Sequence, residues 1–201
     1  MYNLEVGQWH NFLVGCSGVV AHNSYLQELL KEYKFENLFN SYKQKFLNIL
    51  AKEEEVGIRF YTFNDVSESL NRMLRGEIQM TKFYEALSKT MVSGLDKLKG
   101  FKGITTGGYS MPTNYIKSNF MNNVGGEFKP GYFMSSSKSG SVVAEFTGNI
   151  EITFIGKNGK EIKTLSTLPA EDEVLFNMTS VFEVKSAKLD GSIYKVSLIE
   201  K

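Results

Sequence analysis

Hydrophobic and polar residues alternate at the start of the chain. Tyr2, Leu4 and Val6 are separated by polar side chains, residues 12–14 are apolar, and a pair of valines follows the glycine at position 18. A period of two sends successive side chains to opposite faces of an extended chain. The pattern therefore predicts two or three short strands before residue 24.

From Ser24 the apolar residues recur every three or four positions, which is the period of an amphipathic helix. Over residues 24–50 they are Leu26, Leu29, Leu30, Tyr33, Leu38, Phe39, Tyr42, Phe46, Leu47 and Leu50. A further helix is predicted after Asn64, with Asp65 as its cap and Gly76 at its end. Another is predicted over residues 80–98, with a buried face formed by Phe83, Leu87, Met91 and Leu95.

After Gly100, glycine and serine become frequent and short β-type runs replace the helical pattern. Asn158 and Gly159 predict a tight turn between two strands. We therefore expect an α+β fold with a helical N-terminal lobe and a mainly antiparallel β core. The strands are predicted at residues 132–134, 150–155, 173–176, 182–184 and 193–199, and a short helix at 141–146.

The composition limits the classes of partner. Lys and Arg number 23 and Asp and Glu 22, so the formal charge of +1 does not favour nucleic acid. The single cysteine, Cys16, excludes an intrachain disulfide and suits a reducing cytosol. We expect no metal, no membrane span and no signal peptide, so export would require a separate carrier.

Residues 1–23 resemble the C-terminal end of Hint (intein-like) domains, which precede the toxin part of bacterial polymorphic toxins. His10 and a closing His22–Asn23 pair carry this resemblance. It implies cleavage after Asn23, whose side-chain amide would attack its own carbonyl with help from His22 and His10. The nucleophilic half of a Hint domain is not in this sequence, so we expect no efficient cleavage. Alternatively, His22 and Asn23 are an ordinary turn.

Two carboxylates, Glu171 and Glu173, flank Asp172 just before a β-type run. In an extended chain these two glutamates share a face while Asp172 points away. Paired carboxylates suit a reaction that develops positive charge, such as formation of an oxocarbenium ion. On its own, an acidic triplet at this place is more often a solvated turn.

A serine triplet, Ser135 to Ser137, follows the aromatic pair Tyr132–Phe133 upstream of the carboxylates. A serine-rich strand end alone is usually a loop signal. Its order relative to Glu171 and Glu173 resembles the Arg–Ser–Glu class of mono-ADP-ribosyltransferase toxins. The match covers residues 100–201, and the helices before it are compatible with the helical lobe of that family.

The resemblance implies a two-sheet fold over residues 24–201, with a helical lobe (24–99) and a β catalytic core (100–201), and NAD as the substrate. Glu173 would stabilise the oxocarbenium-like transition state, Ser135 would hold Glu173, and Glu171 would orient or deprotonate an acceptor arginine. The residues implied in NAD binding are Ser136, Ser137, Phe133, Tyr132, Thr106, Gly107 and Gly108.

The arginine that anchors NAD in this class has no counterpart here. In the preferred register Gly107 takes its place, and in another register Lys102 does. Charge-assisted hydrogen bonds contribute about 1.5–3 kcal/mol each, so their loss would weaken NAD use. The chain is either an inactivated variant or a divergent one in which Lys102 or another basic residue compensates. The glycines could also mark a flexible turn in a different fold.

The leading hypothesis is transfer of ADP-ribose from NAD to an arginine of a target-cell protein. NAD hydrolysis and a catalytically silent binding module are the alternatives. The resemblance further implies delivery into the target-cell cytoplasm by a larger upstream carrier, and a cognate immunity protein as a partner.

Overall fold

The computed structural model describes residues 13–14, 19–20, 36–139 and 148–201. β1 (Leu13–Val14) and β2 (Val19–Val20) pair antiparallel, in agreement with short strands near the start. The residues expected to take part in Hint cleavage and the expected helix at 141–146 lie outside the described residues; the former are His10, His22 and Asn23.

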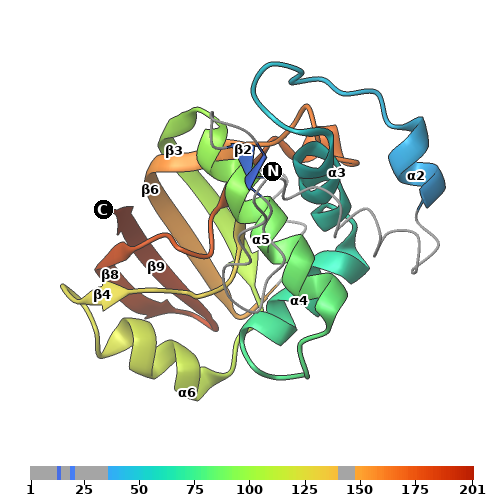
Figure 1. Cartoon of the computed structure of the whole chain (residues 1–201). Helices are drawn as coiled ribbons and strands as arrows, with labels where there is room; N and C mark the ends of the chain where they lie inside the picture. The colour runs from blue at the N-terminus through green and yellow to red at the C-terminus, as the bar shows by residue number, and fades with distance from the viewer. Residues whose placement is uncertain (1–12, 15–18, 21–35, 140–147) are drawn as a thin grey trace.

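Four described helices form the first part of the fold: α2 (Glu36–Ser41), α3 (Lys52–Tyr61), α4 (Asn64–Leu74) and α5 (Lys82–Lys97). In Figure 1, α3, α4 and α5 lie together beside the strands. The core between them also includes Phe133, Ile162 and Leu175 from the β part, so the two parts pack through a shared apolar contact.

The helix prediction from the apolar period was most accurate for α5. Its buried face carries Phe83, Leu87, Met91 and Leu95 as predicted. The Thr81 hydroxyl caps the helix by accepting a hydrogen bond from the backbone N–H of Tyr84.

Other helix predictions need correction. α4 begins at Asn64 with Phe63 as the N-cap, so Asp65 lies in the first turn, where its charge favours the helix dipole. The predicted end at Gly76 is confirmed, because the helix ends at Leu74 and Gly76 has a positive φ of 74°. Between α2 and α3 no described residue is helical, and Leu47 is 72% exposed, so the predicted helical face is wrong there. The sequence pattern did not predict α3.

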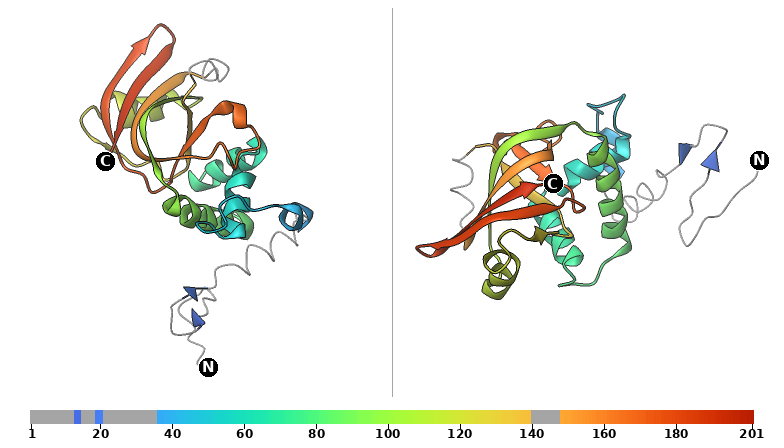
Figure 2. Two further views of the ribbon diagram at one scale, coloured as in Figure 1. Left: turned by 90° about the horizontal axis from the view of Figure 1, so that it is seen from above. Right: turned by 90° about the vertical axis from the view of Figure 1, so that its left-hand side faces the viewer.

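The second part is built on strands. They are β3 (Gly100–Tyr109), β4 (Glu127–Phe128), β5 (Met134–Ser137), β6 (Ile150–Glu161), β7 (Glu173–Phe176), β8 (Phe182–Asp190) and β9 (Ile193–Glu200). A helical segment between β3 and β4 starts as α6 (Thr113–Ile116) and continues as a π-helical turn (Lys117–Met121). Figure 2 shows the strands and the α3–α5 helices as separate layers.

The seven strands form one hydrogen-bonded network in the order β3-β5-β7-β6-β9-β8-β4. β3 also pairs with β6, so β3, β5, β7 and β6 close on one another. The pairings are antiparallel except for that between β6 and β9. The expected α+β fold with a mainly antiparallel core is confirmed. Within this core, β6 pairs with both β3 and β7, and β5 lies between these two strands.

The predicted turn at Asn158 and Gly159 is wrong, because both residues lie within β6. Backbone N–H groups of Lys157, Asn158 and Gly159 all donate to Oε2 of the buried Glu200, at 2.7, 2.6 and 3.3 Å. A Cβ on Gly159 would lie 2.7 Å from the ring of Phe176. The glycine therefore serves a close packing contact inside a strand, not a hairpin.

Candidate active site

Ser135 on β5 and Glu173 on β7 are joined by a hydrogen bond, with Ser135 Oγ donating to Glu173 Oε1. The two strands pair antiparallel, with Ser137 opposite Glu173 and Ser135 opposite Leu175. The two residues that the sequence order associated are thus in direct contact, and Glu173 is only 6% exposed.

The other two serines connect neighbouring segments. Ser136 Oγ donates to the Val174 carbonyl at 3.0 Å and is hydrogen-bonded to Thr105 Oγ1 at 2.8 Å, which links β5 to β7 and β3. Ser137 Oγ donates to the backbone carbonyl of Glu171 at 2.6 Å. These hydroxyls therefore fix the strands and the turn around the Ser135–Glu173 pair.

Glu171 ends a 3-10 turn (Pro169–Glu171), and Asp172 follows in the left-handed conformation with φ 49°. The two glutamates are therefore not related as alternate residues of one extended strand, which corrects that expectation. Asp172 does point elsewhere, because its carboxylate pairs with Lys163 at 2.7 Å.

Burial dominates the electrostatics of Glu173. Removal from water raises the pKa of its carboxyl to about 7, and the negative charge of Glu171 adds to this effect, whereas the hydrogen bond from Ser135 opposes it. A carboxyl with such a pKa changes charge near neutral pH. The coupling also indicates that the Glu171 carboxylate lies near that of Glu173.

Gly107 lies next to this pair on β3. A Cβ placed there would be 2.8 Å from the backbone oxygen of Ser135, and the hydroxyl of Tyr109 donates to the same oxygen at 2.5 Å. Thr106 pairs with Ser137, and Gly108 pairs with Glu151 of β6. The preferred register, with Gly107 at the position of the arginine, is therefore the one that brings β3 to Ser135.

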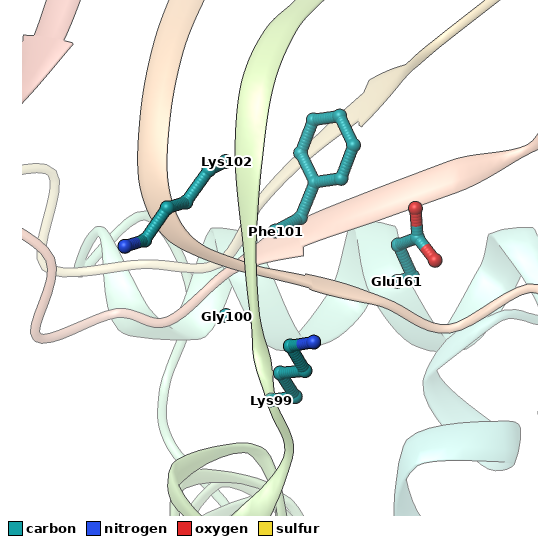
Figure 3. A pocket seen from close by; sticks show the side chains of 5 residues that line it. All are labelled: Lys99, Gly100, Phe101, Lys102 and Glu161. Atoms are coloured by element: carbon teal, nitrogen blue, oxygen red, sulfur yellow. The ribbon is translucent and has the colours of Figure 1, made fainter.

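Lys102 occupies a different place. It is exposed and lines a surface pocket of about 510 Å³ near the start of β3, together with Lys99, Gly100, Phe101 and Glu161. In Figure 3 its side chain points away from β3 on the opposite side from Phe101. Within the described part of the chain, Lys102 makes no hydrogen bond or ion pair, including none with Ser135 or Glu173.

Tyr132 and Phe133 precede β5, so the expected aromatic strand ending in serines is corrected to a strand of one methionine and three serines. Both rings are buried, at 3% and 1% exposed. Phe133 packs edge-on against Tyr61 at 5.5 Å, and the Arg75 guanidinium lies 5.1 Å from the centre of the Tyr132 ring. Their part in an NAD pocket stays a prediction.

Asn71 on α4 is a residue that sequence reasoning missed. Its amide donates to the Phe133 carbonyl at 3.0 Å and accepts from the Phe133 N–H at 3.1 Å, and it also donates to the Tyr61 hydroxyl. An asparagine on a helix has no local sequence signal for such a contact, because its partner is 62 residues away.

The segment before Glu171 is tied to the end of α3. Arg59 Nη1 donates to the carbonyls of Leu165 and Ser166 at 3.1 and 3.2 Å. The Thr167 N–H donates to Thr62 Oγ1 at 3.0 Å, and Thr167 Oγ1 donates to the Thr62 carbonyl at 3.1 Å. The helical part therefore holds the turn that carries Glu171.

Within the described residues, no group of three or more His, Cys, Asp or Glu side chains is arranged to hold a metal ion. In the same part of the chain, no helix has both the length and the apolar character that crossing a bilayer requires.

Comparison with known proteins defines the class. The family model for NAD:arginine ADP-ribosyltransferase matches residues 23–201, and the chain belongs to that family. It is 33% identical over 139 residues to the NAD(+)–protein-arginine ADP-ribosyltransferase Tre1 of Serratia proteamaculans (strain 568), and 29% identical over 153 residues to Tre1 of Pseudomonas putida (strain GB-1). These matches cover 69% and 75% of this chain but 30% of each relative.

Solved structures show the same fold. Exoenzyme S from Pseudomonas aeruginosa, determined with human 14-3-3 protein beta and carba-NAD, has a TM-score of 0.74 at 17% identity, covering 90% of this chain and 88% of that chain. The effector XopAI from Xanthomonas axonopodis pv. citri has a TM-score of 0.68 at 20% identity, covering 89% and 76%.

Proposed function

We propose that this chain transfers ADP-ribose from NAD to an arginine side chain of a target protein. The observation that carries the proposal is the buried Glu173 carboxylate held by the Ser135 hydroxyl, in a chain of the NAD:arginine ADP-ribosyltransferase family. As the bond from the ribose to nicotinamide breaks, its electron pair leaves with nicotinamide and positive charge develops on the ribose. The ionised Glu173 stabilises that charge.

Glu171 then acts on the acceptor. It is half-buried, and its charge reaches Glu173, which supports a position beside the reacting ribose. Its carboxylate orients the acceptor guanidinium and takes up the proton released as the arginine nitrogen bonds to the ribose carbon. Ser136 and Ser137 hold the strand and the turn, while Thr106, Gly107 and Gly108 lie along the nucleotide.

For the NAD phosphates, we propose Arg75 as the basic residue that compensates for Gly107. Burial raises the pKa of the Tyr61 hydroxyl above its usual range and the charge of Glu173 adds to this, whereas Asn71 and the charge of Arg75 act in the opposite direction. Tyr61 thus lies within reach of both charges. The Arg75 guanidinium, which also pairs with Glu77 at 2.6 Å, lies 5.1 Å from the centre of the Tyr132 ring, and this supports a place for Arg75 at the same site. Arg75→Ala should raise the KM for NAD roughly tenfold or more.

The test is incubation with NAD labelled in the adenylate part, using polyarginine as the acceptor and polylysine as the control. The proposal requires label on polyarginine only, and none with Glu173→Gln. Nicotinamide release without labelling would favour NAD hydrolysis, and no release with retained NAD binding would favour a silent module.

We also propose, from the resemblance of residues 1–23, that the chain is the toxin part of a larger delivered protein with a cognate immunity protein. Cleavage after Asn23 is expected to be inefficient. Mass spectrometry of the incubated protein tests this, because substantial release of a product beginning at Ser24 would contradict it.

A further inference from the structure

The hydrogen-bonded ladder between β3 and β5 ends beside the candidate site. Their only described residue pair is Thr106 with Ser137, so the Ser135 carbonyl lies beyond the ladder on its β3 side. That carbonyl accepts a hydrogen bond from the Tyr109 hydroxyl at 2.5 Å. A side chain of β3 thus satisfies an acceptor that a backbone N–H would satisfy in a continuous ladder.

The side chain of Tyr109 passes over the Cα of Gly107 to reach the carbonyl of Ser135. A Cβ added at Gly107 would lie 2.7 Å from the Tyr109 hydroxyl and 2.8 Å from its Cε2 atom. Both distances are shorter than any ordinary contact of a Cβ, so a side chain at position 107 and the observed tyrosine position exclude each other. Gly107 is itself buried.

Ser135 is therefore held at two points. Its carbonyl accepts a hydrogen bond from Tyr109, and its hydroxyl donates one to Glu173. Displacing the backbone of Ser135 would change the direction of the hydroxyl, which sets the hydrogen bond to the carboxylate.

We propose that Tyr109 is a positioning residue that acts through Ser135 on Glu173, and that Tyr109, together with the nearby Ser135 oxygen, leaves no room for a side chain at position 107. The consequence for catalysis rests on the proposed function. It follows that Gly107→Arg alone does not restore an NAD anchor, because the new side chain expels Tyr109 and disturbs Ser135.

Kinetics test the positioning role. Tyr109→Phe removes only the hydroxyl and should lower kcat roughly 3- to 10-fold, the range of one neutral hydrogen bond. It should also move the acid limb of the pH–rate profile upward, because a weakened bond from Ser135 stabilises the Glu173 carboxylate less. In a Ser135→Ala background the same change should have less than about a twofold effect. The matched control is Tyr194→Phe, whose hydroxyl makes no hydrogen bond within the described residues.

An unmoved acid limb, or an effect on kcat that adds in full to that of Ser135→Ala, would overturn the role of Tyr109. Gly107→Arg should leave NAD turnover at or below the wild-type rate, and Gly107→Arg combined with Tyr109→Val should exceed Gly107→Arg alone. A higher rate for the single arginine variant would overturn the exclusion.

Folding stability tests the contact without any activity, so a silent chain would disprove the proposed function and leave this measurement intact. Gly107→Ala should reduce the folding equilibrium constant at least about tenfold more with Tyr109 present than in a Tyr109→Val background, or about 1.4 kcal/mol. The contact between the new Cβ and the Ser135 oxygen is present in both backgrounds, so it cancels when the two losses are compared. Equal losses in the two backgrounds would show that Tyr109 and Gly107 are not coupled.

Discussion

Ser135 donates its hydroxyl hydrogen bond to the carboxylate of Glu173, a residue 38 positions further along the chain. The bond favours the ionised carboxylate, while burial of the same group favours the neutral form and prevails. The ionised, buried carboxylate of Glu173 therefore lowers the stability of the folded chain, and this can be measured.

The first consequence concerns pH and stability. Burial raises the pKa of Glu173 in the folded chain to about 7 from the usual value of 4.5. Its contribution to stability is therefore fully present below about pH 4.5 and is lost as the pH rises through 7. Glu173→Gln should increase the free energy of unfolding at pH 8 by on the order of 2–3 kcal/mol, with little gain at pH 4.5. Urea unfolding at both values checks this, and an equal effect at both would contradict the buried titration.

Glu171 should separate transfer from NAD cleavage. Glu171→Gln removes the proton acceptor but keeps the shape of the turn, whose backbone is held by Ser137. Labelling of polyarginine should fall roughly 100-fold or more, while nicotinamide release into water should stay within about threefold of wild type. Equal losses of both reactions would show that Glu171 serves NAD cleavage itself.

Asn71 should be a stabilising residue of the fold. Replacing it by leucine leaves the Phe133 N–H, the Phe133 carbonyl and the Tyr61 hydroxyl without this partner. We expect a loss of about 2–3 kcal/mol in the free energy of unfolding. Thermal or urea unfolding measures it, with the exposed Asn64→Leu of the same helix as the control. A loss below about 0.5 kcal/mol would show that water replaces the amide.

The helical part should influence acceptor modification through Arg59. Arg59→Lys loses the fork that reaches two carbonyls of the segment before Glu171. Polyarginine labelling should fall about three- to tenfold while nicotinamide release changes less than about twofold. The control is Arg72→Lys, an exposed residue that pairs with Glu77. If both reactions fall together, the segment affects the whole site and not the turn alone.

The sequence predicted those elements that pack one regular apolar face against the core, because their hydrophobic residues then recur with a helix or strand period. α5 and β7 lie where the pattern indicated. α3 was not predicted because Glu54 and Glu55 on it are buried. Their carboxylates are satisfied by Lys97 of α5 and by the backbone N–H groups of Lys45 and Phe46, partners that no local period reveals.

The same limit applies to the site. The contact between Ser135 and Glu173 followed from the order of two short motifs. The hydroxyl of Tyr109 donates to the backbone carbonyl of Ser135 on β5, and the amide of Asn71 donates to that of Phe133, just before β5. Every residue type has a backbone carbonyl, so the sequence does not show which carbonyl accepts such a hydrogen bond. Gly107 was visible as a departure from the family pattern, but its reason depends on the path of a neighbouring side chain.

The rate of nicotinamide release from NAD as a function of pH tests the central role of Glu173 most directly. We expect the rate of the wild-type chain to rise through about pH 7 as the carboxyl ionises, and the rate of Glu173→Gln to be roughly 100-fold or more lower at pH 8. A Glu173→Gln variant that releases nicotinamide within a few-fold of wild type would contradict the assignment of Glu173 as the catalytic carboxylate.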